Sequence, residues 1–89
     1  MCVLCVVCVL YFAQSADLTG VRGEESVAVP TPISSQDLWT LLLRRHPRLS
    51  ALQRRVVLAV RQQYVAIGDH LLTLEDGDEV AVVPPLSGG

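Results

Sequence analysis

Apolar residues are concentrated in two uninterrupted runs, one near each end of the chain. The first run, Met1 to Ala13, reads MCVLCVVCVLYFA, and the last, Val80 to Val83, reads VAVV. Both consist of strand-compatible residues, and a strand buried on both faces reads as such a continuous run. The pattern therefore predicts a buried β-strand at each end of the chain. If these two strands pair in parallel, a helix must cover them.

Two other interpretations of the first run stay open. A transmembrane helix needs about 20 apolar residues, and this run stops earlier, at Gln14. A signal peptide fits the length, with Ala13-Gln14-Ser15 as the cleavage site, but the first basic residue is Arg22. Cleavage would also remove a strand from a small domain. These points favour the strand.

One amphipathic helix is predicted between the two runs. Ser34 followed by Asp37 is a helix-start signature, with Ser35 as an alternative cap, and Pro47 ends the helix. Trp39 lies off the apolar stripe and is predicted to be a partly buried edge residue. The stripe consists of Leu38, Leu41 and Leu42, and the last turn carries Arg44 and Arg45.

Shorter patterns predict the other elements, which together form a small α+β sheet with one helix packed across it. Leu49 to Arg55 fits either a short helix or a loop. We expect a helical turn over Gln14 to Gly20 and a strand over Glu25 to Val29 that Pro30 and Pro32 end. We expect a second strand over Val56 to Val60, which pairs through the turn Arg61-Gln62 with a strand over Gln63 to Ala66. Leu71 to Leu74 is expected to be a short extended segment.

Two clusters have the residue types of metal sites. Cys2, Cys5 and Cys8 lack a fourth cysteine, and His46 and His70 each stand alone. Strand geometry places successive cysteines on opposite faces and about 10 Å apart, too far for a disulfide. We interpret them as small apolar residues of a reducing compartment such as the cytosol. The acidic run over 75–79, EDGDE, fits an Asp-Gly turn better than a calcium loop. We therefore expect no metal site.

Composition limits the classes of function. A chain of 89 residues forms one domain with little room for a deep enzyme pocket beside its core, which favours a carrier, a binding module or a subunit. The apolar content of 51% excludes disorder, and the net charge of −2 gives no basic footprint for nucleic acid. All seven basic residues are Arg, so lysine-linked polymers of this chain cannot form.

The chain ends in an arm suited to insertion into a partner. We divide the sequence into a domain over residues 1–85 and a flexible tail over 86–89. Pro84 and Pro85 restrict the backbone to extended conformations, and Gly88 and Gly89 allow close approach to another protein. Leu86 is the apolar anchor of this arm, and Ser87, which has no local base, is a spacer.

Three stretches resemble the family of small subunits of molybdopterin synthase. They are VLYFAQSADLTGV over 9–21, AVRQQYV over 59–65 and GDEVAVVPPLSGG over 77–89. The last block is the most specific, because ubiquitin-like modifiers and the thiamine sulfur carrier share only its Gly-Gly. The resemblance covers nearly the whole chain, and the triple-cysteine opening departs from the family pattern.

This resemblance implies a β-grasp, ubiquitin-like fold and a sulfur-carrier function. ATP, consumed by a ubiquitin-activator-like adenylyltransferase, would adenylate Gly89, and a sulfur donor would convert it to a thiocarboxylate. Sulfur would pass to cyclic pyranopterin monophosphate in a complex of two small and two large subunits. No cofactor would be bound permanently. The resemblance gives Phe12 a partner contact, although it could equally be a core residue. Arg61 is interpreted as a solvated turn residue.

Three alternatives remain. The chain could be a ubiquitin-like protein modifier joined through Gly89, a sulfur carrier for thiamine or tRNA thiolation, or an interaction domain with an incidental Gly-Gly. The product formed at the C-terminus, a thiocarboxylate or a covalent adduct to another protein, distinguishes a carrier from a modifier. Deletion of Gly89 would leave the function of an interaction domain intact.

Overall fold

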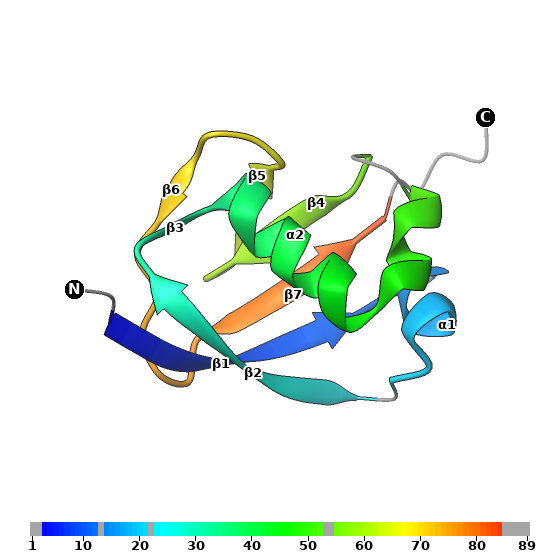
Figure 1. The fold of residues 1–89 in the computed structure, drawn as a ribbon, viewed down its shortest axis with the longest axis horizontal. Coiled ribbons are helices and arrows are strands. Elements are labelled where there is room, and N and C mark those ends of the chain that lie inside the picture. The colour runs from blue at the N-terminus through cyan, green and yellow to red at the C-terminus, as the bar shows by residue number, and fades with distance from the viewer. Residues whose placement is uncertain (1–2, 13, 22, 53–54, 85–89) are drawn as a thin grey trace.

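A five-stranded mixed sheet forms the body of the protein, and the helices lie over one of its faces (Figure 1). The structure is a computed structural model that describes residues 3–12, 14–21, 23–52 and 55–84. The elements in chain order are β1 (Val3–Tyr11), α1 (Gln14–Thr19), β2 (Glu24–Thr31), β3 (Ile33–Ser34), α2 (Ser35–Arg45), a 3-10 helix η1 (Pro47–Leu52), β4 (Val57–Val60), β5 (Gln63–Ala66), β6 (Leu71–Leu72) and β7 (Glu79–Val83).

The two end strands lie side by side in the middle of the sheet, which is the pairing that the sequence analysis considered as a condition. The strand order is β2-β1-β7-β4-β5, and β3 pairs separately with β6. β1 and β7 are parallel, from Cys8 opposite Glu79 to Tyr11 opposite Val82. Because parallel strands cannot be joined by a tight turn, the intervening chain supplies the helix that crosses them. The expected α+β arrangement is confirmed.

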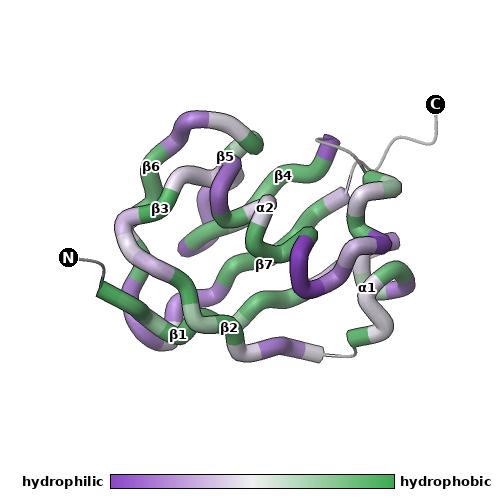
Figure 2. The backbone as a smooth tube through the Cα atoms, viewed as in Figure 1, coloured by the Kyte–Doolittle hydropathy of each residue, from purple (hydrophilic) through white to green (hydrophobic). Residues whose placement is uncertain are grey.

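β1 is buried on one face only, which corrects the expectation of burial on both faces. Cys5, Val7 and Val9 are buried against the helices, whereas Leu4 and Val6 are exposed on the opposite face. Figure 2 shows that the central strands are largely apolar. Apolar residues lie both on the face that the helices cover and on the opposite face. We call the uncovered side the outer face of the sheet. Its apolar content made β1 read as a doubly buried strand.

α2 begins as the sequence indicates. The Ser34 hydroxyl accepts a hydrogen bond from the Asp37 amide at 3.0 Å and caps the helix. Leu38 and Leu42 of the predicted stripe are buried. Trp39 is only 1% exposed, so its assignment as an edge residue was wrong. The neighbouring helix η1 packs beside α2, and the buried face of α2 extends beyond the leucine stripe to Trp39.

β2 also runs further than its prolines suggested. It continues through Pro30, which pairs with Leu4, and ends at Thr31. β2 is an edge strand of the sheet, where proline is tolerated because no further strand needs its amide.

The open choice over Leu49 to Arg55 is decided in favour of a 3-10 helix over Pro47–Leu52. Among the described residues, no helix is long and apolar enough to cross a membrane.

Candidate functional site

Most of the predicted tail lies outside the described residues. This applies to Pro85, Leu86, Ser87, Gly88 and Gly89, and to the boundary between 1–85 and 86–89. Two residues of the predicted site are described, Pro84 and Phe12. Pro84 is buried directly after β7, and Phe12 directly follows β1. The site can therefore be built from the root of the tail and the surface beside it.

Backbone and side-chain hydrogen bonds hold the root of the tail. The Val82 carbonyl accepts a hydrogen bond from the Phe12 amide at 3.3 Å. The Ser15 hydroxyl, which is fully buried, donates to the Phe12 carbonyl at 2.6 Å and lies 3.4 Å from the Val82 oxygen. These contacts join the ends of β1 and β7 and set the point where the chain leaves the sheet. The sequence analysis considered Ser15 only as part of a possible cleavage site and of a helical turn, and it did not identify this role.

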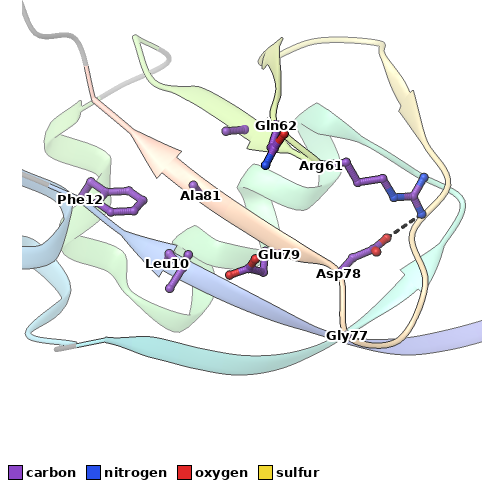
Figure 3. A pocket seen from close by; sticks show the side chains of 9 residues that line it. Leu10, Phe12, Arg61, Gln62, Gly77, Asp78, Glu79 and Ala81 are labelled. Atoms are coloured by element: carbon purple, nitrogen blue, oxygen red, sulfur yellow. Dashed lines mark hydrogen bonds and ion pairs between the residues drawn. The ribbon is translucent and has the colours of Figure 1, made fainter.

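A groove of about 500 Å³ lies on the outer face next to this root (Figure 3). Phe12 lies at one end of this groove and is 50% exposed, which decides against a core position. Apolar residues of three adjacent strands form part of the groove floor, and polar residues of two turns form part of the groove rim. The residues that line this outer groove are Leu10, Phe12, Ala59, Arg61, Gln62, Gly77, Asp78, Glu79 and Ala81.

One rim of the outer groove is the β4–β5 turn. Arg61 and Gln62 both have positive φ angles, 51° and 67°, as the predicted two-residue hairpin requires. The Arg61 guanidinium donates to Asp78 Oδ2 at 2.7 Å, the contact drawn as a dashed line in Figure 3. This hydrogen bond lowers the pKa of the Asp78 carboxyl. Arg61 is therefore an exposed turn residue, as predicted, and its guanidinium is also ion-paired with the neighbouring acidic turn at one end of the groove.

The acidic run lies beside the β4–β5 turn at the same end of the groove and is a structural turn, as expected. Asp76 Oδ1 accepts a hydrogen bond from the Val6 amide at 2.8 Å, and the Gly77 amide donates to the Val6 carbonyl at 2.9 Å. Gly77 has a φ of 87°, a conformation that favours glycine. No group of side chains suited to holding a metal ion occurs among the described residues.

The two described cysteines lie on opposite faces of β1, as the alternation predicts. Cys5 is buried in the core, and Cys8 is half-buried on the outer face; both are free thiols. Burial raises the pKa of the Cys8 thiol, and the carboxylates of Glu24 and Glu79 raise it further. The thiol therefore stays protonated at neutral pH and is a weak nucleophile. Cys2 lies outside the described residues.

A polar cluster joins the end of α2 to β1 and β2. The Glu25 carboxylate accepts a hydrogen bond from the Tyr11 hydroxyl at 3.0 Å, and His46 Nε2 lies 3.0 Å from the same oxygen. Arg45 Nε lies 3.6 Å from it. The sequence suggested that His46 stands alone, but its ring contacts the Glu25 carboxylate. Burial raises the pKa of Glu25, but hydrogen bonds from His46 and Tyr11 outweigh it, and the net pKa is lowered.

This cluster predicts a pH-dependent stability. A carboxyl whose pKa is lowered by folding stabilises the protein above its unfolded pKa, near 4.5, and this contribution is lost as the pH falls through the folded value. We expect Glu25→Gln to lower the free energy of unfolding at pH 7 by on the order of 1 kcal/mol. The difference from the parent should shrink toward pH 3 in urea titrations. Glu24→Gln, an exposed neighbour, is the control, and a difference that stayed constant with pH would contradict the prediction.

Comparisons with known proteins place these features in a class. A mixed sheet crossed by one main helix, with its two end strands parallel at the centre, defines a β-grasp, ubiquitin-like protein. A putative molybdopterin converting factor subunit 1 from Pyrococcus furiosus shares this fold with a TM-score of 0.72 and 32% identity, covering 92% of this chain and 99% of its own. SAMP1 from Haloferax volcanii is similar at a TM-score of 0.73 and 25% identity, covering 94% and 99%.

Within that class, residues 9–89 match the ThiS family, and the chain belongs to this family. The chain is also 52% identical over 86 residues to the human protein named molybdopterin synthase sulfur carrier subunit. The aligned residues cover 97% of each of these two chains.

Proposed function

We propose that this protein is the sulfur carrier subunit of a molybdopterin synthase, acting in molybdenum cofactor biosynthesis. The observation that carries the proposal is the 52% identity to a relative of that name over 97% of both chains. The β-grasp fold and the exposed outer groove beside the root of the tail support it.

The proposed chemistry takes place at the carboxylate of Gly89. A carboxylate is a poor electrophile at neutral pH, and adenylation by an ATP-consuming enzyme supplies a good leaving group. A sulfur donor then displaces AMP and leaves a thiocarboxylate on Gly89. Two thiocarboxylated carriers each deliver one sulfur to cyclic pyranopterin monophosphate, which together form the dithiolene, and water restores the carboxylate of each Gly89. The large subunit supplies the acid and base groups for the transfer.

The outer groove is the proposed docking surface for the large subunit. Its floor is apolar, and Phe12 contributes both to the groove and, through its amide, to the root of the tail. A partner that seats on the groove therefore lies where the tail leaves the sheet and can receive it. We propose an assembly of two small and two large subunits in the cytosol, where the free thiols of Cys5 and Cys8 are stable.

Intact mass spectrometry tests the proposal. The protein is incubated with ATP, a matching activating enzyme and a sulfur source, and the expected gain equals the replacement of one oxygen by sulfur. Addition of the large subunit and the precursor should then reverse the gain and form the dithiolene product. No gain, with an activating enzyme that works on a known carrier, would refute the proposal.

Phe12→Ala is expected to weaken binding of the large subunit about thirtyfold, the effect of losing one hot-spot aromatic residue. Stability should change by less than about 1 kcal/mol, because the side chain is already half exposed. Isothermal titration calorimetry and urea unfolding measure the two quantities. Leu71→Ala is the matched control, since Leu71 is an exposed apolar residue of β6 that does not line the groove. Equal affinities for parent and Phe12→Ala would contradict the prediction.

A protein modifier is the second candidate, favoured by the similarity to SAMP1, whose name denotes a small archaeal modifier protein. In that case Gly89 would become attached to amino groups of other proteins. Covalent adducts in cell extracts, in place of a thiocarboxylate and dithiolene product, would identify this function. A carrier for thiamine or tRNA thiolation would form the thiocarboxylate but would not support dithiolene synthesis.

A further inference from the structure

The β4–β5 turn keeps two side chains in a conformation that they rarely adopt. Arg61 and Gln62 occupy its two central positions with φ angles of 51° and 67°. Turns of this kind are dominated by Gly, Asn and Asp, because a Cβ atom is strained at positive φ. An Asn-Gly pair would form the same hairpin with less strain. A strained conformation that persists at a surface site indicates that the side chains themselves have a use.

Both side chains lie on the rim of the outer groove (Figure 3). Arg61 is anchored because Asp78 Oδ2, in the neighbouring acidic turn at the same end of the groove, accepts from its Nη2 atom at 2.7 Å. Asp78 is itself fixed, since the same oxygen accepts from the Glu75 amide at 2.9 Å. The Arg61 side chain is nevertheless half exposed. A guanidinium has five N–H donors, so an anchored Arg61 still offers donors to a partner in a defined direction.

We propose that Arg61 and Gln62 are recognition residues for the large subunit, and that the turn keeps its strain to present them. The partner surface that fits has an apolar side chain for the groove floor and, beside it, a carbonyl or carboxylate oxygen that accepts from Arg61 and Gln62. A cation of the partner next to this oxygen pairs with Glu79, which makes no ion pair within the described part of the chain. This inference rests on the proposed function.

Two matched alanine variants test the role of the amide side chain. Gln62→Ala removes the side chain at the groove rim. Gln63→Ala makes the same chemical change one residue later, where the side chain lies outside the groove beside Val60 and Leu72. We expect calorimetry to show at least about tenfold weaker binding of the large subunit for Gln62→Ala, and a change of less than about twofold for Gln63→Ala.

A third variant separates recognition from folding. Arg61→Asn with Gln62→Gly builds the less strained Asn-Gly turn, so its Tm should equal or exceed that of the parent. Its affinity for the large subunit should nevertheless fall by more than that of Gln62→Ala. A stable Asn-Gly turn with the affinity of the parent would overturn the inference.

The parent protein distinguishes the two levels of the proposal. If the parent binds the large subunit and both turn variants bind within about twofold of it, this inference is wrong and the proposed function stands. If the parent forms no thiocarboxylate and does not bind the large subunit, the proposed function is wrong, and this inference is overturned with it.

Discussion

Deletion of Gly89 is expected to abolish thiocarboxylate formation completely. The deletion moves the terminal carboxylate one residue closer to the sheet, and the reacting carbon no longer reaches the position that the activating enzyme requires. Misplacement of a reacting group by a single ångström can reduce a rate by about a hundredfold, and one residue of extended chain spans about 3.3 Å. Intact mass spectrometry after incubation with ATP, the activating enzyme and a sulfur source is the measurement.

Stability should not change, because glycine has no side chain to remove from a core. Gly68→Ala is the matched control within the folded domain, since an added Cβ there meets no atom within 4 Å. This variant should form the thiocarboxylate at the rate of the parent. Thiocarboxylate formation on the shortened chain would show that the chemistry does not depend on Gly89 and would contradict the proposed function.

Trp39→Ala is expected to have the largest effect on stability. The indole is 1% exposed in the cluster that α2 and η1 share with the sheet. Truncation of a buried tryptophan costs about 3–5 kcal/mol, whereas a whole small domain is stable by only about 5–15 kcal/mol. The variant should therefore unfold at a much lower urea concentration or be partly unfolded at 25 °C.

Circular dichroism is the suitable probe, because Trp39 is the only tryptophan of the chain and its fluorescence is lost in the variant. Tyr64→Ala provides the control: this aromatic side chain is 76% exposed, and its removal should change the free energy of unfolding by less than about 0.5 kcal/mol. A loss below about 1 kcal/mol for Trp39→Ala would mean that the indole is not part of the core.

Local chemistry made several elements of the fold predictable. Ser34 caps α2 because its hydroxyl satisfies an amide only three residues away. The Arg61-Gln62 turn was expected from the two strand patterns that flank it, and the Asp76-Gly77 turn from its residue types. Such features depend only on residues a few positions apart along the chain, so the local sequence is sufficient to predict them.

Contacts between distant segments were not predictable in the same way. The clustering of Tyr11, Glu25 and His46 requires β1, β2 and the end of α2 to meet. Burial of Trp39 requires other elements to cover α2, and tolerance of Pro30 requires β2 to be an edge strand. The hydrophobic pattern within one helix or strand does not show which other element will pack against it. The sequence pattern for β1 was ambiguous for the same reason.

The sequence by itself determined the two apolar end strands and the capped helix, because composition and short-range hydrogen bonding specify them. Only the tertiary structure decided that the outer face is uncovered, that Phe12 is exposed at the root of the tail and that Arg61 is anchored to Asp78 at one end of the groove. These features arise where residues from β1, β7 and the β4–β5 turn converge. Their convergence follows from the strand order, which depends on the packing of the whole chain.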